Sequence, residues 1–261
     1  MSDDALLHTI DSNGTAIVTL NRPQLHNAFD DELIARLTTL FHELGSNEVV
    51  RVVLLAANGK SFSAGADLNW MRRMANYTEE ENYQDAMRLA DMLRTLNELS
   101  KPTIALVHGA TFGGGVGLIA CCDIVLAAPE ASFSLSEVKL GIIPAVISPY
   151  VVSAVGPRMA RRYALTAERF STNEALRIGL VHEVVEAESL HTRARELATV
   201  LINNGPNALR ECKALIHNVA RGRIDQRMIE ETAQRIARIR ASDEGQEGLS
   251  AFLEKRKPNW I

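Results

Sequence analysis

The chain has 261 residues, of which 46% are hydrophobic and 23% charged. This composition is typical of one large folded domain, with or without a small appendage, and excludes a disordered chain. With 28 Lys and Arg against 32 Asp and Glu, the net charge is −4, so we expect no nucleic-acid partner. No apolar stretch approaches the roughly 18 residues of a membrane span. The N-terminus carries no signal-peptide pattern, and the sequence therefore predicts a cytoplasmic protein that contacts no membrane.

The first predicted elements are a hairpin, a helix and a buried strand. Asn13-Gly14 is a hairpin signal between two β-rich runs over 6–20, the second of which is the predicted strand 16–20. Apolar residues at helical spacing predict a helix over 30–44, which Gly45 ends. The continuous apolar run 49–57 favours a strand buried on both faces.

Further along, strands alternate with helical stretches. A polar helix is predicted over 83–99, a strand over 103–107, a buried helix over 118–122 and another strand over 123–127. This alternation predicts an α/β fold. From Gly156 onward nearly every segment favours helix, including 208–219 and 225–240, which suggests helical packing or an oligomer contact. Cys121, Cys122 and Cys212 have neither metal nor disulfide spacing, and we expect reduced thiols.

The glycine cluster 112–117 is the first candidate for chemistry, because it follows a strand and precedes a helix. Glycines let a backbone approach a ligand closely, and a helix N-terminus offers free N–H groups to negative charge. A tight strand-to-helix turn explains the cluster equally well. The segment matches neither G-x-G-x-x-G nor a P-loop, so we expect no nucleotide-phosphate site of either kind.

Two further candidates each have a structural alternative. Small residues over 63–66 could expose another backbone N–H, whereas Asp67 could simply cap a following helix. Glu137 lies in an apolar stretch, where desolvation would raise the pKa of its carboxyl and suit it to proton transfer. The alternative for Glu137 is a solvated side chain paired with Lys139. The histidines are scattered without metal-pair spacing, so no metal site is predicted.

Taken in order, segments along nearly the whole chain resemble the crotonase (enoyl-CoA hydratase/isomerase) superfamily. Each segment is a weak signal alone, but their joint order is specific. The matching segments are Leu20-Asn21-Arg22-Pro23 with Asn27-Ala28, 62–68, Lys101-Pro102, Gly109 with Gly113-Gly114-Gly115, Cys122-Asp123-Ile124, 136–144, Ala175 with Gly179-Leu180-Val181, and 251–256.

The resemblance implies a fold and an assembly. It implies a crotonase-like α/β spiral of ββα units with a C-terminal helical trimerisation region. Residues 1–195 are then the spiral core with the active site, and residues 196–261 the oligomerisation region. The resemblance further implies homo-trimers or hexamers, an acyl-CoA thioester as substrate, and neither a metal nor a redox cofactor.

The resemblance also assigns roles to residues. The backbone N–H groups of Ala66 and Gly114 would form an oxyanion hole, which stabilises the enolate-like oxygen that develops on the thioester. The residues expected to bind the substrate are Gln24, His26, Ala64, Asp67, Leu68, Met71 and Gly117, together with Phe252 and Lys255, which match C-terminal residues that reach the CoA of a neighbouring subunit. Glu137 would be the catalytic acid and base.

The sequence departs from two-carboxylate hydratases of this superfamily at one position. Those enzymes carry a first Glu where this chain has Gly117, and they share the second, Glu137. A lone Glu is the pattern of enoyl-CoA isomerases. The segment 145–150, however, together with Gly117, Asn69-Trp70-Met71 and Cys121-Cys122, resembles bacterial methylglutaconyl-CoA hydratases. Close relatives of those proteins act on longer carboxygeranoyl-type thioesters.

The leading prediction is therefore hydration of a branched, carboxylated enoyl-CoA similar to 3-methylglutaconyl-CoA. A single-Glu enoyl-CoA isomerase is the alternative, and a weakly catalytic CoA-ester-binding or RNA-binding protein is a third interpretation. We hypothesise that Gly117 leaves room for the substrate's branch and removes repulsion with its carboxylate. Ser148 could help to hold water, and Arg72 or Arg73 could pair with the substrate carboxylate.

Overall fold

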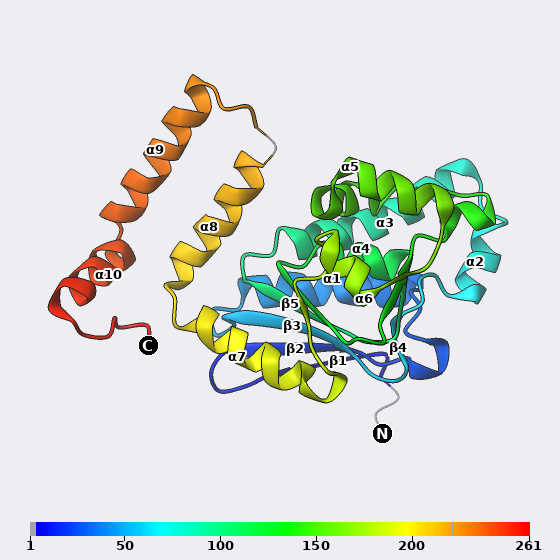
Figure 1. Ribbon diagram of the computed structural model, residues 1–261, viewed down its shortest axis with the longest axis horizontal. Helices are drawn as coiled ribbons and strands as arrows, with labels where there is room; N and C mark the ends of the chain where they lie inside the picture. The colour runs from blue at the N-terminus through cyan, green and yellow to red at the C-terminus, as the bar shows by residue number, and fades with distance from the viewer. Residues whose placement is uncertain (1–3, 221) are drawn as a thin grey trace.

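Two β-sheets organise the part of the chain that this computed structural model describes, residues 4–220 and 222–261 (Figure 1). The larger sheet has the order β1-β2-β3-β5-β7-β10, and all of its pairs except β1 with β2 are parallel. The smaller sheet has the order β4-β6-β8-β9. The strands are β1 Leu6–Ile10, β2 Thr15–Leu20, β3 Val52–Ala57, β4 Ser61–Ser63, β5 Thr103–Val107, β6 Ala110–Phe112, β7 Ile124–Ala127, β8 Ser132–Ser134, β9 Phe170–Ser171 and β10 Glu183–Val184.

The chain winds repeatedly from the large sheet to the small sheet and then into a helix. Three such turns follow one another: β3-β4-α2, β5-β6-α4 and β7-β8-α5. This is the predicted α/β spiral of ββα units, which the structure confirms. The α-helices are α1 Asp31–Ser46, α2 Leu68–Met74, α3 Glu79–Asn97, α4 Gly114–Ala120, α5 Ser148–Thr166, α6 Thr172–Arg177, α7 Leu190–Ile202, α8 Pro206–Val219, α9 Gln226–Ala241 and α10 Asp243–Glu254.

Helices cover both faces of the large sheet. Alternate residues of β3 point to opposite faces, so Val53 packs with the buried faces of α1 and α3, whereas Leu54 packs with α7. The α1 face is the predicted one, with Leu33, Ile34, Leu37, Leu40, Phe41 and Leu44 all buried. The Asp30 carboxylate caps this helix by accepting a hydrogen bond from the Leu33 N–H at 2.8 Å.

Several element boundaries differ from the predicted ones. Helix α4 begins at Gly114 rather than at residue 118, because the glycine run itself forms the first turn. Helix α3 begins four residues earlier than predicted, at a capping box formed by Thr78 and Glu81. Helix α5 begins at Ser148 and bends at Gly156, whose φ of 73° is non-helical. The mostly helical region beyond this bend also contains β9 and β10.

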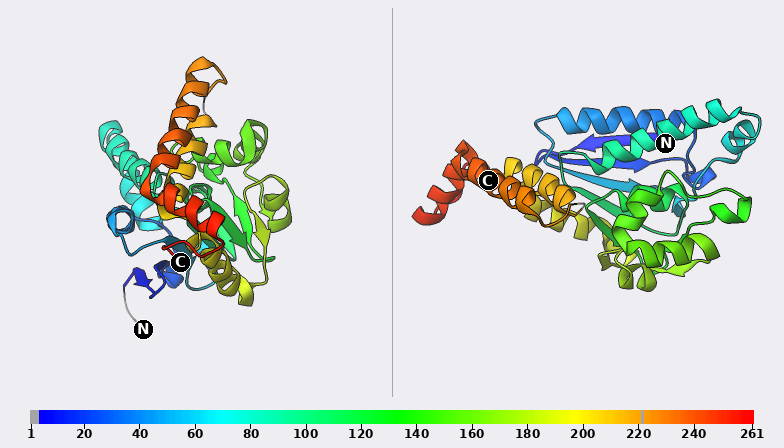
Figure 2. Two further views of the ribbon diagram at one scale, coloured as in Figure 1. Left: turned by 90° about the vertical axis from the view of Figure 1, so that its left-hand side faces the viewer. Right: turned by 90° about the horizontal axis from the view of Figure 1, so that it is seen from above.

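The C-terminal helices stand apart from the body. Helix α7 is part of the body, since Leu190, Ala194 and Ala198 are buried against the large sheet. The predicted division between 195 and 196 falls inside α7, and the structure places the spatial division after this helix. Helices α8, α9 and α10 project outward, as Figure 2 shows from two further directions. The Lys213 ammonium of α8 still contacts the Asp123 carboxylate of the body at 2.8 Å.

The sequence predicts neither membrane contact nor a metal site. No helix in the described part of the chain is both long and apolar enough to span a membrane. Within residues 4–220 and 222–261, no group of three or more His, Cys, Asp and Glu side chains is gathered as a metal site. The absence of a cofactor stays a prediction.

Candidate active site

Two loops meet where parallel strands of the small sheet end. Strands β4 and β6 pair through Ser61 with Ala110 and Ser63 with Thr111. Their carboxyl ends lead into the loop 64–67 and into Gly113 at the start of α4. A Cβ atom placed on Gly65 would lie 3.3 Å from the Phe112 carbonyl oxygen, so the two loops are in contact. The structure thus brings together the two predicted donor segments, which are 48 residues apart in the sequence.

The Ala66 N–H is left free by the way its loop is held. The Phe29 N–H donates to the Gly65 carbonyl and the Asp67 N–H donates to the Phe29 carbonyl, both at 2.7 Å. In such a parallel bridge, the N–H of the residue between the two bonds points away from the partner strand. No acceptor for this N–H lies within residues 4–220 and 222–261, and Ala66 is exposed.

The Gly114 N–H is free for a different reason. Gly114 is the first residue of α4, and the first N–H groups of a helix have no acceptor within the helix. The preceding Gly113 has a φ of 50° and donates its own N–H to the Ser134 carbonyl at 2.9 Å. Two unpaired backbone donors therefore belong to adjoining loops, which is the requirement for an oxyanion hole.

Glu137 lies next to this pair of donors. It begins a short 3₁₀ helix, Glu137–Leu140, that follows β8. One carboxylate oxygen, Oε1, lies 3.1 Å from a Cβ atom placed on Gly113. The other, Oε2, is buried and has no hydrogen-bond partner in the described chain. Burial raises the pKa of the Glu137 carboxyl. Among the described residues Glu137 forms no ion pair with Lys139, and its Oε2 atom is buried, so the alternative of a solvated, paired Glu137 was wrong.

Comparison with known proteins shows the family of the chain. The profile of the family described as Enoyl-CoA hydratase/isomerase matches residues 11–261. The chain belongs to this family. A crystal structure of an enoyl-CoA hydratase from Shewanella pealeana is 48% identical, covers 98% of this chain and 96% of its own, and superposes with a TM-score of 0.96.

Relatives of the chain include both hydratases and isomerases. A short-chain-enoyl-CoA hydratase of Clostridium acetobutylicum is 35% identical over 93% of this chain and 92% of its own. A mitochondrial Δ(3,5)-Δ(2,4)-dienoyl-CoA isomerase of Dictyostelium discoideum is 32% identical over 95% and 88%, respectively. Family membership therefore supports an enzyme acting on an enoyl-CoA and leaves the reaction to be argued from the site.

The structure contradicts the hypothesis that Gly117 leaves room for a substrate branch. Gly117 lies one helical turn beyond Gly113, on α4, and is buried. A Cβ atom placed on it would lie 2.3 Å from Ile147 Cγ2 and 2.7 Å from Ile147 Cβ. The space that a side chain at 117 would occupy is already filled by Ile147. The loss of a carboxylate at this position is thus compensated by apolar packing rather than by an open volume.

The variant Gly117→Ala tests this packing. We expect it to destabilise the fold by about 1–3 kcal/mol, because overpacking a close-packed interior forces its neighbours to move. Thermal unfolding of Gly117→Ala, Ile147→Ala and the double variant forms a double-mutant cycle. The two changes should partly compensate, since Ile147→Ala removes the Cγ2 atom but keeps the Cβ atom. Additive losses would show that the two positions do not compete for the same space.

The remaining predicted substrate-binding residues of the body lie on the segment 23–26 after β2, on the loop 64–67 and at the start of α2. The His26 carbonyl accepts from the Ala64 N–H at 2.9 Å, and His26 Nδ1 lies 3.1 Å from Ser61 Oγ. Gln24, His26 and Leu68 are exposed, while Ala64 and Met71 are half-buried.

Asp67 is buried and its carboxylate is engaged by the protein. Oδ1 accepts from the Asn69 and Trp70 N–H groups at 2.8 and 3.1 Å and so caps α2, while Oδ2 faces Arg22. The helix-capping alternative for Asp67 is therefore confirmed.

Phe252 and Lys255 lie far from this site within their own chain. Phe252 belongs to α10 and is 80% exposed, and Lys255 ends the same helix with a φ of 56°. Figure 1 places α10 at the opposite end of the molecule from α2 and β4. Within one chain Phe252 and Lys255 are therefore remote from the loop 64–67 and from Gly114, so their predicted role depends on a neighbouring subunit.

Three hypothesised helpers of the substrate are engaged elsewhere. Arg72 donates to the Asn69 side-chain oxygen at 2.7 Å, and Arg73 pairs with Asp31. The Ser148 hydroxyl donates to the Ala145 carbonyl at 2.8 Å. Each of these side chains thus has a partner within the chain, and its role toward a substrate stays a prediction.

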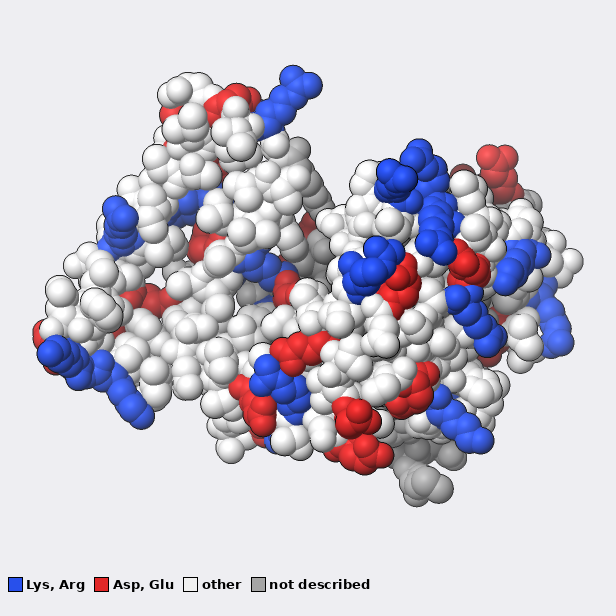
Figure 3. All heavy atoms as spheres, in the orientation of Figure 1, with Lys and Arg blue, Asp and Glu red and all other residues white. Residues whose placement is uncertain are grey.

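Sequence reasoning missed a cavity beside Ile147. It has a volume of about 200 Å³, lies in the bend of α5, and has mostly apolar walls. The Arg161 guanidinium, one of the lining groups, has no ion pair or hydrogen bond within the described ranges. Arg158 and Arg162 lie on the same helix, and Figure 3 shows Lys and Arg side chains gathered over this part of the molecule. The negative net charge of the chain gave no sign of this local basic patch.

Proposed function

We propose that the protein adds water across the double bond of a branched, carboxylated 2-enoyl-CoA similar to 3-methylglutaconyl-CoA. The observation that carries this proposal is the unpartnered Glu137 carboxylate oxygen beside the loops that supply the free Ala66 and Gly114 N–H groups. Two fixed N–H donors stabilise the negative charge that develops on a thioester oxygen during conjugate addition.

A single carboxylate can carry both proton transfers of this reaction. The ionised Glu137 accepts a proton as a water molecule attacks C3, and the π electrons move onto the thioester oxygen. The C3–O bond is then formed, and the enolate is held by the two N–H groups. The protonated Glu137 next returns the proton to C2, and the thioester carbonyl is restored. A pKa raised by burial suits a group that must both accept and return a proton near neutral pH.

The cavity in the bend of α5 is an argument for a branched, carboxylated acyl group as the substrate. Its lining includes Leu135, which is two residues before Glu137 in the sequence, and Ile147, which packs on Gly117. Apolar walls suit a hydrocarbon tail, and the unpaired Arg161 guanidinium suits a terminal carboxylate. The absence of a second active-site carboxylate at Gly117 removes a like charge that such a substrate would otherwise meet.

An enoyl-CoA isomerase is the second candidate, and the lone Glu137 favours it. Moving a double bond requires one base that takes a proton from one carbon and returns it to another, so no second carboxylate is needed.

Turnover in ¹⁸O- and deuterium-labelled water separates these candidates. The purified protein is incubated with crotonyl-CoA, a 3-enoyl-CoA and 3-methylglutaconyl-CoA, and the products are analysed by mass spectrometry. We expect ¹⁸O incorporation, highest with 3-methylglutaconyl-CoA. Deuterium uptake without ¹⁸O would instead identify an isomerase.

The same assay tests the carboxylate anchor. Arg161→Gln should raise the KM for 3-methylglutaconyl-CoA by about tenfold, the loss expected for a charge-assisted hydrogen bond, and leave the KM for crotonyl-CoA nearly unchanged. Arg158→Gln is the matched control, because Arg158 is on the same helix but does not line the cavity. Equal effects on both substrates would remove Arg161 from substrate recognition.

We further propose that the C-terminal helices pack against other copies of the chain, in a trimer. Helices α8 and α9 bury no residue of their own, and apolar side chains on α8 to α10 such as Ile216, Ile229, Leu249 and Leu253 are half or more exposed. Contiguous exposed apolar surface favours association. Light scattering of the intact protein would give the mass of three chains, or of six if trimers pair.

A further inference from the structure

Phe29 links the two donor loops of the site. Its main chain bonds to Gly65 and Asp67, on either side of Ala66. Its ring is fully buried and lies 3.0 Å from a Cβ atom placed on Gly114. The position of Ala66 relative to Gly114 therefore depends on where Phe29 is held.

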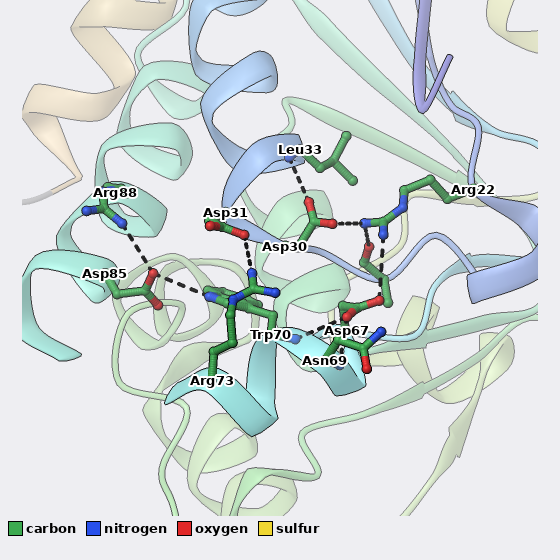
Figure 4. A network of polar contacts seen from close by, with 11 residues as sticks. Arg22, Asp30, Asp31, Leu33, Asp67, Asn69, Trp70, Arg73, Asp85 and Arg88 are labelled. Atoms are coloured by element: carbon green, nitrogen blue, oxygen red, sulfur yellow. Dashed lines mark hydrogen bonds and ion pairs between the residues drawn. The ribbon is translucent and has the colours of Figure 1, made fainter. Parts of the chain in front are cut away.

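Arg22 holds the residues on both sides of Phe29. Its Nη1 donates to the Ala28 carbonyl at 3.0 Å and lies 2.6 Å from the Asp30 carboxylate. Its Nη2 lies 3.6 Å from the Asp67 carboxylate, directly after Ala66. The Arg22 side chain is only 14% exposed. Figure 4 shows this guanidinium between the segments that begin α1 and α2.

The two carboxylates have divided roles. The Oδ1 atoms of Asp30 and Asp67 cap α1 and α2, respectively, whereas their Oδ2 atoms face Arg22. The helix caps therefore do not use Arg22, and the contacts with Arg22 are left to fix the spacing between the two loops. An arginine suits this role because its planar guanidinium presents several donors in fixed directions, whereas the ammonium of a lysine is a single point.

We propose that Arg22 is a positioning residue that fixes the Ala66 N–H relative to the Gly114 N–H, acting through residues 28–30 and Asp67. This inference rests on the proposed function, in which these two N–H groups bind the thioester oxygen. Arg22 touches no substrate. Its loss should therefore weaken stabilisation of the developing charge more than it weakens binding of the CoA thioester.

Arg22→Lys is the informative variant, because it keeps the positive charge and leaves both helix caps in place. We expect kcat to fall by about tenfold or more and KM to change by less than about threefold, since a small misplacement of catalytic groups is costly in rate. Asp67→Asn is a second variant, which keeps the Oδ1 cap and removes the charge that faces Arg22. It should show the same pattern, and it supplies a result if Arg22→Lys does not fold.

A spectroscopic measurement separates positioning from general destabilisation. An aryl-acryloyl-CoA thioester absorbs at longer wavelength when hydrogen bonds polarise its carbonyl. We expect a red shift on binding to the wild-type protein and a clearly smaller shift with Arg22→Lys and Asp67→Asn. Arg193→Lys is the control, because Arg193 forms a similar two-pronged contact with Glu183 of β10, the edge strand of the large sheet opposite β1. This control should keep the full shift and the full kcat.

The outcomes distinguish a failure of the role of Arg22 from a failure of the proposed function. A full red shift and a full kcat in the Arg22 and Asp67 variants would overturn the role of Arg22 and leave the proposed function intact. A thioester that binds the wild-type protein with no red shift would overturn the oxyanion hole itself, and the inference with it. Equal losses in the Arg193→Lys control would show that the effect is general destabilisation and would also overturn the inference.

Discussion

Glu137→Gln is expected to lower kcat by about 10³-fold, the scale at which a general acid and base contributes to enzymatic rates. The amide fits the same space but cannot take a proton from water or return one to C2. Hydration and deuterium exchange at C2 should be lost together, because one group performs both transfers. Turnover of 3-methylglutaconyl-CoA in labelled water measures both in a single experiment.

The pH dependence of the rate and of the Tm also tests the role of Glu137 as the acid and base. Since burial raises the pKa of Glu137 above its ordinary value of 4.5, the acid limb of the wild-type rate profile should lie above that value. A raised carboxyl pKa gives a stability contribution that is fully present below the unfolded pKa and is lost as the pH rises through the folded pKa. The substituted glutamine cannot ionise, so the Tm of Glu137→Gln at pH 7–8 should equal or exceed that of the wild type.

The control for this variant is Glu130→Gln, which neutralises an exposed carboxylate on a turn of the same chain. It should leave both rate and Tm unchanged. Near wild-type turnover by Glu137→Gln would exclude Glu137 as the acid and base. A lowered Tm would attribute the lost activity to misfolding instead.

Ala66→Pro is expected to lower kcat by about 10²- to 10³-fold, as removal of one oxyanion-hole donor does. Proline removes the N–H of residue 66 but no donor or acceptor of the bridge to Phe29, because that bridge uses the Gly65 carbonyl and the Asp67 N–H. The thioester should still bind, so the loss should fall on kcat rather than on KM. Steady-state kinetics with crotonyl-CoA, together with the Tm, measure this division.

A proline elsewhere controls for the substitution itself. Gln226→Pro places proline at the first position of α9, where the N–H has no helical acceptor and the preceding Asp225 is extended with a φ of −126°. This control should retain full turnover. Equal KM and kcat effects for Ala66→Pro would indicate that the loop had moved as a whole rather than lost one donor.

Local sequence signals predicted most of the elements and not their exact beginnings. The spacing of the apolar residues in α1 predicted its whole buried face, because apolar residues recur there every three or four positions. The predicted start of α4 is four residues late, since glycine has poor helix propensity and three of the first four residues of this helix are glycines. The register between strands and the position of the bend at Gly156 depend on contacts between residues distant in sequence. The amino-acid sequence alone does not reveal such contacts.

The sequence predicted the site residues that belong to short motifs. It did not predict the contacts between side chains of different segments. Ala66, Gly114 and Glu137 came from short segments whose order resembles the family, and the fold brings these segments together. The role of Arg22 was not predicted although it lies within a quoted motif, because it depends on the contact with Asp67, 45 residues further along the chain. The filling of the space at Gly117 by Ile147 was likewise invisible, since 30 residues separate the two positions.

The contact between Gly117 and Ile147 constrains the order in which this active site could change by successive mutations. A glutamate introduced first at position 117 would meet the Ile147 side chain and destabilise the chain before any second carboxylate could act. Replacing Ile147 first by a smaller residue opens a small cavity, at a cost that a stable fold can tolerate. Conversion between one-carboxylate and two-carboxylate chemistry on this scaffold is therefore a two-step path, and the apolar residue must change before the charged one arrives.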